Sequence, residues 1–151
     1  MKNFFNFLNI YKVKILILFL LLILYIFFNS FLYVNQVSSD LQKNVFRLHV
    51  IANSNEEEDQ KLKYIVRDNL ISYMQTLCID SKSKEETIKI VSDNIDNFTN
   101  IAHQTILDNG FDYNASLEVG NFEFPTKNYG DISFPAGYYD ALEVKIGEAS
   151  R

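Results

Sequence analysis

Tryptophan is absent from this chain of 151 residues, and cysteine, proline and glycine are scarce, with one, two and five copies. The lone Cys78 excludes an intrachain disulfide and a multi-cysteine metal site. All prolines and glycines lie between Gly110 and Gly147. Because proline fixes φ and glycine permits φ > 0, the first 109 residues should form long regular elements, with the irregular backbone in the last third.

The part of the chain after residue 34 also has no excess of basic residues. After residue 34, 11 basic side chains stand against 19 acidic ones, a net charge of −8. An acidic domain repels phosphate backbones, so nucleic acid is excluded as a natural partner. The acidic balance favours solubility instead.

Residues 1–34 are typical of a signal or transmembrane segment. Three lysines lead into an unbroken apolar run from Ile15 to Phe28, and the apolar character continues to Val34. As a helix, the stretch from Ile15 to Val34 would reach about 30 Å and span a bilayer. Positive charge stays on the cytoplasmic side, so the rest of the chain should be exported. Val37-Ser38-Ser39 is a moderate cleavage site, which leaves both a cleaved signal and a retained anchor open.

Residues 35–43 are polar and are expected to form a tether, followed by one domain over 44–151. The patterns predict the order strand, helix, helix, strand, strand. This order is typical of a small two-layer α+β domain, in which a sheet of about three strands carries two helices on one face. The expected elements are a strand at 44–52, a helix from Ser54 to Leu77, a helix from Ser83 to Asn109, and strands at 115–124 and 139–146.

Alternation and capping signals support these elements. Ser54 with Glu57, and Ser83 with Glu86, have the spacing of capping boxes. Gly120-Asn121 predicts either a bulge or a tight turn in its strand. On the first strand the two faces are Phe46, Leu48, Val50 and Ala52 against Val45, Arg47, His49 and Ile51. The apolar helix stripes are Leu62, Ile65, Val66, Tyr73, Met74 and Leu77, then Ile88, Val91, Ile95, Phe98, Ala102 and Ile106.

A catalytic constellation is not recognisable in this sequence. Metalloprotease, phosphate-loop and nucleophile-elbow motifs are absent, and nothing brings Asp131 and Asp140 together as an acid pair. Cys78 ends an apolar stripe, where it should pack as a small hydrophobe. We therefore expect a non-enzyme without a cofactor or metal. The alternatives are an envelope hydrolase or metal-dependent enzyme that uses His49 and Arg47, and a generic membrane-anchored extracytoplasmic domain.

The proline- and glycine-bearing stretch combines irregular backbone with many aromatic side chains. Such side chains anchor interfaces, or they fold back and close the core, and the sequence leaves both open. The aromatic residues are Phe124, Tyr129, Phe134, Tyr138 and Tyr139. The candidate partner-binding residues are Arg47, His49, Lys127, Tyr129, Asp131 and Tyr138.

Two parts of the chain resemble the stage II sporulation protein R family of endospore-forming Firmicutes. The first is Phe46-Arg-Leu-His-Val-Ile-Ala-Asn-Ser54, with Asp59-Gln60 and Val66-Arg67-Asp68 after it. The second is Phe124-Pro-Thr-Lys-Asn-Tyr-Gly130, with Pro135-Ala-Gly-Tyr138 and Ala141-Leu-Glu-Val-Lys-Ile-Gly-Glu148. Together they span roughly residues 44 to 148.

The resemblance implies a signalling protein exported across the forespore membrane into the intermembrane space. There the family activates a membrane-embedded aspartic protease of the mother cell, which processes the sigma-E precursor. Family members continue beyond Ile-Gly-Glu with a tryptophan- and cysteine-containing tail, whereas this sequence ends at Arg151. A truncated product, a divergent member and a fragment are the three readings of that difference.

Overall fold

The computed structural model describes residues 2–130 and 132–149. It divides into two compact units, residues up to Asp40 and residues from Leu41 onward. The first unit consists of helix α1, which runs from Lys2 to Asn44 and so continues into the second. Within α1, Tyr11–Val34 is long and apolar enough to cross a membrane. The polar residues 35–43, expected to be a tether, are helical as well.

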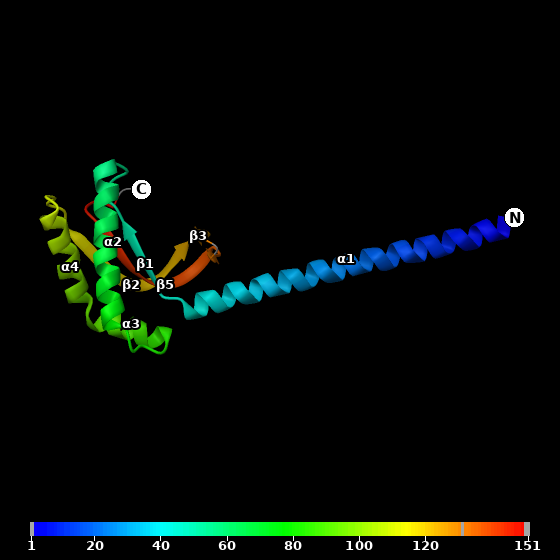
Figure 1. Cartoon of the computed structure of the whole chain (residues 1–151), viewed down its shortest axis with the longest axis horizontal. Coiled ribbons are helices and arrows are strands. Elements are labelled where there is room, and N and C mark those ends of the chain that lie inside the picture. The colour runs from blue at the N-terminus through cyan, green and yellow to red at the C-terminus, as the bar shows by residue number, and fades with distance from the viewer. Residues whose placement is uncertain (1, 131, 150–151) are drawn as a thin grey trace. The chain divides into compact units, whose positions relative to one another are not determined.

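The second unit is an α+β domain, as the sequence predicts, with helices on one side of a small sheet (Figure 1). Strand order in the sheet is β1-β5-β2, with β1 parallel and β2 antiparallel to the central β5. A separate two-stranded hairpin is formed by β3 and β4. The element bounds are β1 Arg47–Ile51, α2 Glu57–Leu77, α3 Lys84–Asp93, α4 Ile95–Asp108, β2 Ala115–Phe124, β3 Lys127–Tyr129, β4 Ile132–Phe134 and β5 Gly137–Ile146.

The main core lies between the sheet and the helices. Alternate residues of β1 and β5 point into it, since successive strand residues face opposite sides. The predicted pattern on the first strand is confirmed, with Phe46, Leu48 and Val50 on the core side. The buried members are Leu62, Val66, Leu70, Val91, Phe98, Ala102, Ile106, Leu142, Val144 and Ile146. Ile65, predicted to be in the stripe of the first helix, is instead 40% exposed.

A second, smaller core occupies the face of the sheet that the helices leave open. Phe124, Tyr139 and Ala141 are buried there, with Val45 and Phe122 packed against them. Central strand β5 is therefore covered on both sides, which explains why most of its residues are buried.

Two helix predictions need correction. The predicted single helix from Ser83 to Asn109 is two helices, because Asn94 ends α3 and begins α4. The side-chain amide of Asn94 donates to the Ile90 carbonyl, and this local hydrogen bond competes with continuation of the helix. The capping box at Ser54 is also wrong: α2 begins at Glu57 without a side-chain cap.

Strand β2 contains neither the bulge nor the turn expected at Gly120-Asn121. Its register against β5 runs unbroken from Ala115 opposite Ile146 to Phe124 opposite Gly137. The strand keeps its alternation, but its buried side changes along its length. Leu117 and Val119 belong to the main core, whereas Phe122 and Phe124 belong to the smaller one.

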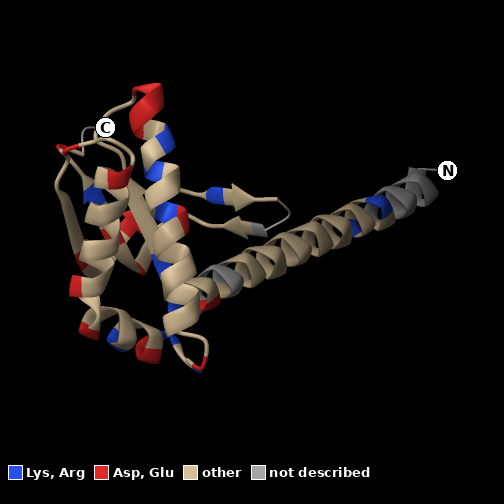
Figure 2. Cartoon of the chain, turned by 60° about the vertical axis from the view of Figure 1, so that its left-hand side comes forward, with Lys and Arg blue, Asp and Glu red and all other residues tan. Residues whose placement is uncertain are grey.

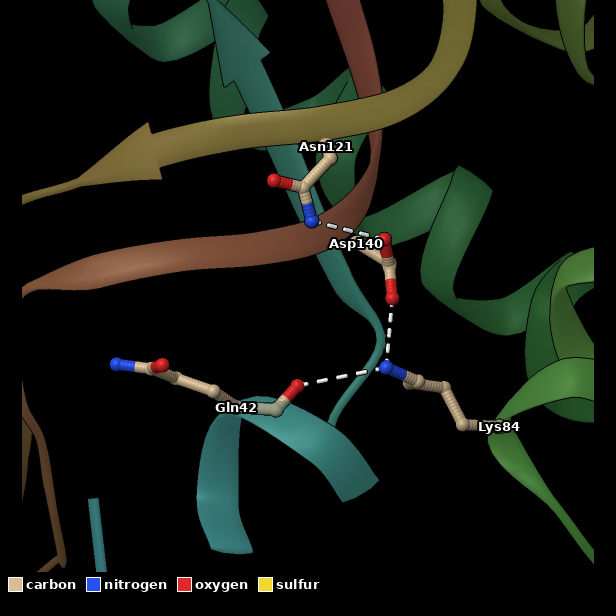
Figure 3. A network of polar contacts seen from close by, with 4 residues as sticks. All are labelled: Gln42, Lys84, Asn121 and Asp140. Atoms are coloured by element: carbon tan, nitrogen blue, oxygen red, sulfur yellow. Dashed lines mark hydrogen bonds and ion pairs between the residues drawn. The ribbon is translucent and has the colours of Figure 1, made fainter. Parts of the chain in front are cut away.

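A polar network within the second unit includes Gln42, which belongs to that unit although it lies in the last turn of α1 (Figure 3). The Lys84 ammonium lies 2.6 Å from the Asp140 carboxylate and donates to the Gln42 carbonyl at 3.4 Å. Asn121 donates to the other Asp140 oxygen at 2.9 Å. Strands β2 and β5 are thereby linked to the start of α3 and to residues just before β1.

Candidate interaction surface

The helix-free face of the sheet is built around small residues in its middle. The register aligns Arg47, Ala141 and Gly120 across the three strands. A Cβ at Gly120 would come within 3.0 Å of the Phe122 ring, so glycine leaves the space that this ring occupies. The same row leaves room for the long Arg47 side chain over the sheet.

Arg47 lies against aromatic rings of this face. Its guanidinium carbon is 3.9 Å from the centroid of Phe124, 4.8 Å from that of Tyr139 and 5.7 Å from that of Phe134. These are cation–π distances, and guanidinium is the cation best suited to stacking. The Nη1 atom of Arg47 is buried and has no hydrogen-bond partner among the described residues. A buried donor of this kind favours an incoming acceptor.

The residues paired across the three strands two positions after Arg47 on β1 are charged or titratable and form a charged row. His49 pairs in register with Glu143, which pairs with Glu118 on the other side. The buried Glu143 carboxylate lies 3.4 Å from His49 Nδ1 and 2.6 Å from the Lys145 ammonium. Two cationic or titratable partners therefore offset the cost of burying this carboxylate.

The aromatic stretch divides between core and surface. Phe124 and Tyr139 are buried, and the Tyr139 hydroxyl donates to the Pro135 carbonyl at 2.8 Å. Tyr129 and Tyr138 are exposed by 57% and 60%. Phe124 and Tyr139 therefore close the core, whereas Tyr129 and Tyr138 stay candidates for an interface.

The β3–β4 hairpin carries the exposed Tyr129 and projects from the sheet (Figure 2). All three residues of β3 are exposed, including Lys127 and Tyr129. Tyr129 makes an edge-to-face contact with Phe134, their centroids 5.7 Å apart. Phe134, a ring of the hairpin, in turn lies 5.7 Å from the Arg47 guanidinium. The hairpin and the helix-free face therefore form one continuous surface.

The structure places the sequence-predicted partner-binding residues in two groups. Arg47 and His49 lie on the helix-free face, while Lys127 and Tyr129 lie on the hairpin and Tyr138 at the start of β5. Asp131, also predicted, lies outside the described residues. Sequence reasoning missed Glu143 as the centre of the charged row. Its alternation with Ala141 and Tyr139 on the last strand was the signal that would have identified it.

Aromatic side chains and an arginine, which are residue types enriched at protein interfaces, gather on this surface. The His49–Glu143 pair orients an imidazole, and the His49 ring also packs against Phe124, their centroids 5.0 Å apart. Within residues 2–130 and 132–149, no group of three or more potential metal ligands comes together. A groove of about 500 Å³ opens on the same face, lined by Phe122, Glu123, Phe124, Pro125, Ala136 and Glu143.

These features define a small α+β domain that follows a helix of membrane-spanning length and presents a cationic and aromatic surface. The family model for stage II sporulation protein R matches residues 42–151, and the chain belongs to that family. Stage II sporulation protein R of Bacillus subtilis strain 168 is 33% identical to it over 101 residues. That match covers 67% of this chain and 45% of the relative, so the chain spans less than half of the relative's length. No solved structure matches significantly.

Proposed function

We propose that this chain is an exported signalling protein of sporulation that activates a membrane-embedded aspartic protease of the mother cell, which then processes the sigma-E precursor. It acts by binding and is not itself the protease. Its membership of a sporulation protein family is the observation that carries the proposal.

Two structural features support this role. A single N-terminal helix of spanning length, preceded by basic residues, suits export of the following domain from the forespore into the intermembrane space. The domain then offers rigid aromatic anchors on a projecting hairpin, which is the side-chain chemistry of protein interfaces. Tyr129, Tyr138 and Lys127 are the exposed residues that we assign to the partner.

Gene deletion tests the proposal. In a synchronously sporulating culture, the deletion strain should form the polar septum but accumulate unprocessed sigma-E precursor, as followed by immunoblotting. Restoring the gene under a forespore promoter should restore processing, while expression in the mother cell alone should not. Normal processing in the deletion strain would show that the chain has another role.

A further inference from the structure

The open edge of the sheet at β1 has the features of a strand-addition site. Strand β1 pairs only with β5 in the described part of the chain, so its other side faces no strand. An edge strand leaves alternate backbone N–H and C=O groups available to another extended chain. All five residues of β1 are only half-buried, in contrast with the central β5.

A groove runs beside this edge, between β1 and the first turns of α2. It has a volume of about 280 Å³ and is lined by His49, Val50, Ile51, Ala52, Asn55, Gln60 and Lys63. The strand supplies one wall and the helix the other, which is the arrangement in which an added strand finds both backbone partners and side-chain contacts.

The charges near this edge indicate the sign of the charge that an incoming segment should carry. Lys63 brings a full positive charge to the groove lining, on a domain whose overall charge is negative. Arg47 and His49 of the same strand are already engaged, Arg47 with the Phe124 and Tyr139 rings and His49 with the Glu143 carboxylate. A strand added beside β1 would bring alternate side chains toward α2, where a carboxylate would form a favourable pair with Lys63.

We infer that the β1 edge binds an extended segment of a partner protein that carries acidic side chains at alternate positions. The other sheet edge, β2, differs in charge, because Glu118 and Glu123 are exposed along it and repel such a segment. The inference rests on the proposed function only in taking the partner to be a protein.

The test uses the full-length chain in lipid nanodiscs and a fluorescein-labelled, end-blocked peptide of five Glu-Val repeats. Fluorescence anisotropy should show saturable binding, and hydrogen–deuterium exchange should show protection of residues 47–52 when the peptide is present. The matched peptide with N-methylvaline keeps the charge but lacks half of the backbone donors, and should bind at least about tenfold more weakly. Lys-Val repeats should not bind.

Two α2 variants complete the test. Lys63→Glu should weaken binding of the Glu-Val peptide about fivefold, with an unchanged circular dichroism spectrum. Lys61→Glu is the control, because Lys61 is exposed and pairs with Glu57 outside the groove.

Four results would overturn the inference: no saturable binding, protection of 115–124 in place of 47–52, equal effects of the two variants, or protection of 47–52 by a second copy of the chain without peptide. None of these bears on sigma-E processing in the deletion strain, so the edge site and the proposed function can fail separately.

Discussion

Two carboxyl groups of the domain have pKa values below the ordinary range. Ser54 holds the pKa of Asp59 down through a 2.6 Å hydrogen bond; burial opposes this, and Asn53 adds a second bond. Lys84 lowers the pKa of Asp140 most strongly, and Asn121 adds to it. A lowered folded-state pKa means that protonation weakens the fold, so both groups couple acidity to stability.

The sign of this coupling is set by the direction of both shifts. Above about pH 5 the two carboxylates are ionised in folded and unfolded chains alike, and their stabilising effect is complete. As the pH falls below about 4, the unfolded chain takes up protons first and stability declines. Urea unfolding of the chain in detergent micelles at pH 3, 4, 5 and 7 should show this loss. A flat profile would contradict the assigned contacts.

Lys84 offers a more local test of the same network. Its side chain is 11% exposed, so Lys84→Met keeps the buried stem but leaves Asp140 without its cation. We expect a loss of about 1 kcal/mol in unfolding free energy at pH 7, and a smaller loss of stability on acidification. Lys82→Met is the matched control, since Lys82 is an exposed lysine two residues earlier. Equal losses in both variants would assign the effect to the helix start and not to the ion pair.

At the scale of elements, two identical Ser-x-x-Glu patterns had different outcomes. Ser83 accepts a hydrogen bond from the Glu86 amide and caps α3 as predicted. Ser54 instead donates to Asp59, a nearly buried carboxylate that lies five residues later. The spacing rule considers only the residue three positions on, whereas Asp59, buried in the first turn of α2, needs hydrogen-bond donors and accepts from the Ser54 hydroxyl.

The alternating sequence pattern predicted the positions of the strands better than the capping and spacing signals predicted the ends of the helices. The alternating stretch at 115–124 coincides with β2, and the last predicted strand with most of β5. The break at Asn94 was not predictable from spacing, because Val91, Ile95 and Phe98 keep the three- and four-residue rhythm across it. One irregular residue interrupts the helix without changing the face that it buries.

The β3–β4 hairpin is the element on which partner binding by this domain is tested most directly. Tyr129→Ala removes an exposed ring, so stability should change by no more than about 0.5 kcal/mol. If the ring is an interface anchor, sigma-E precursor processing should fall roughly tenfold, as measured by quantitative immunoblotting. Lys127→Glu should act in the same direction.

The controls for the hairpin are equally exposed residues elsewhere on the domain. Ile79→Ala removes a large apolar side chain that is 79% exposed, and Lys89→Glu reverses an exposed charge on α3. Both should leave processing unchanged. If the hairpin variants lower only the amount of protein, the hairpin serves folding and not recognition.

At the scale of the whole molecule, the sequence indicated the class and order of elements but not how the sheet is shared between two cores. Leu117 and Phe124 lie on opposite faces of the sheet, because side chains alternate along β2 and the two positions are seven residues apart. This alternation holds only if the strand passes through Gly120 without a bulge or a turn. The sequence allowed a bulge or a turn there. The pairing partner of β1 was also unpredictable, because Arg47 and Ala141 are brought together from opposite ends of the domain.

A truncation series tests the importance of that long-range pairing. A chain that stops after Ala136 lacks the central strand, so neither core can form and cooperative unfolding should disappear. A chain that stops after Glu148 keeps the whole strand and should unfold as the full chain does. Limited proteolysis and urea titration in micelles distinguish the two. Protection of the helices in the shorter chain would show that they fold without the sheet.

The position of β5 also bears on the timing of folding in the proposed export. A chain that crosses a membrane from its N-terminus delivers β1 first and, among the described strands, its pairing partner β5 last. Contacts between such distant segments form slowly, because loop closure must precede them. Under the proposed export, the domain would therefore gain its surface only after β5 has emerged. Delivery of the proposed signal and its folding into a binding-competent form would then be a single event.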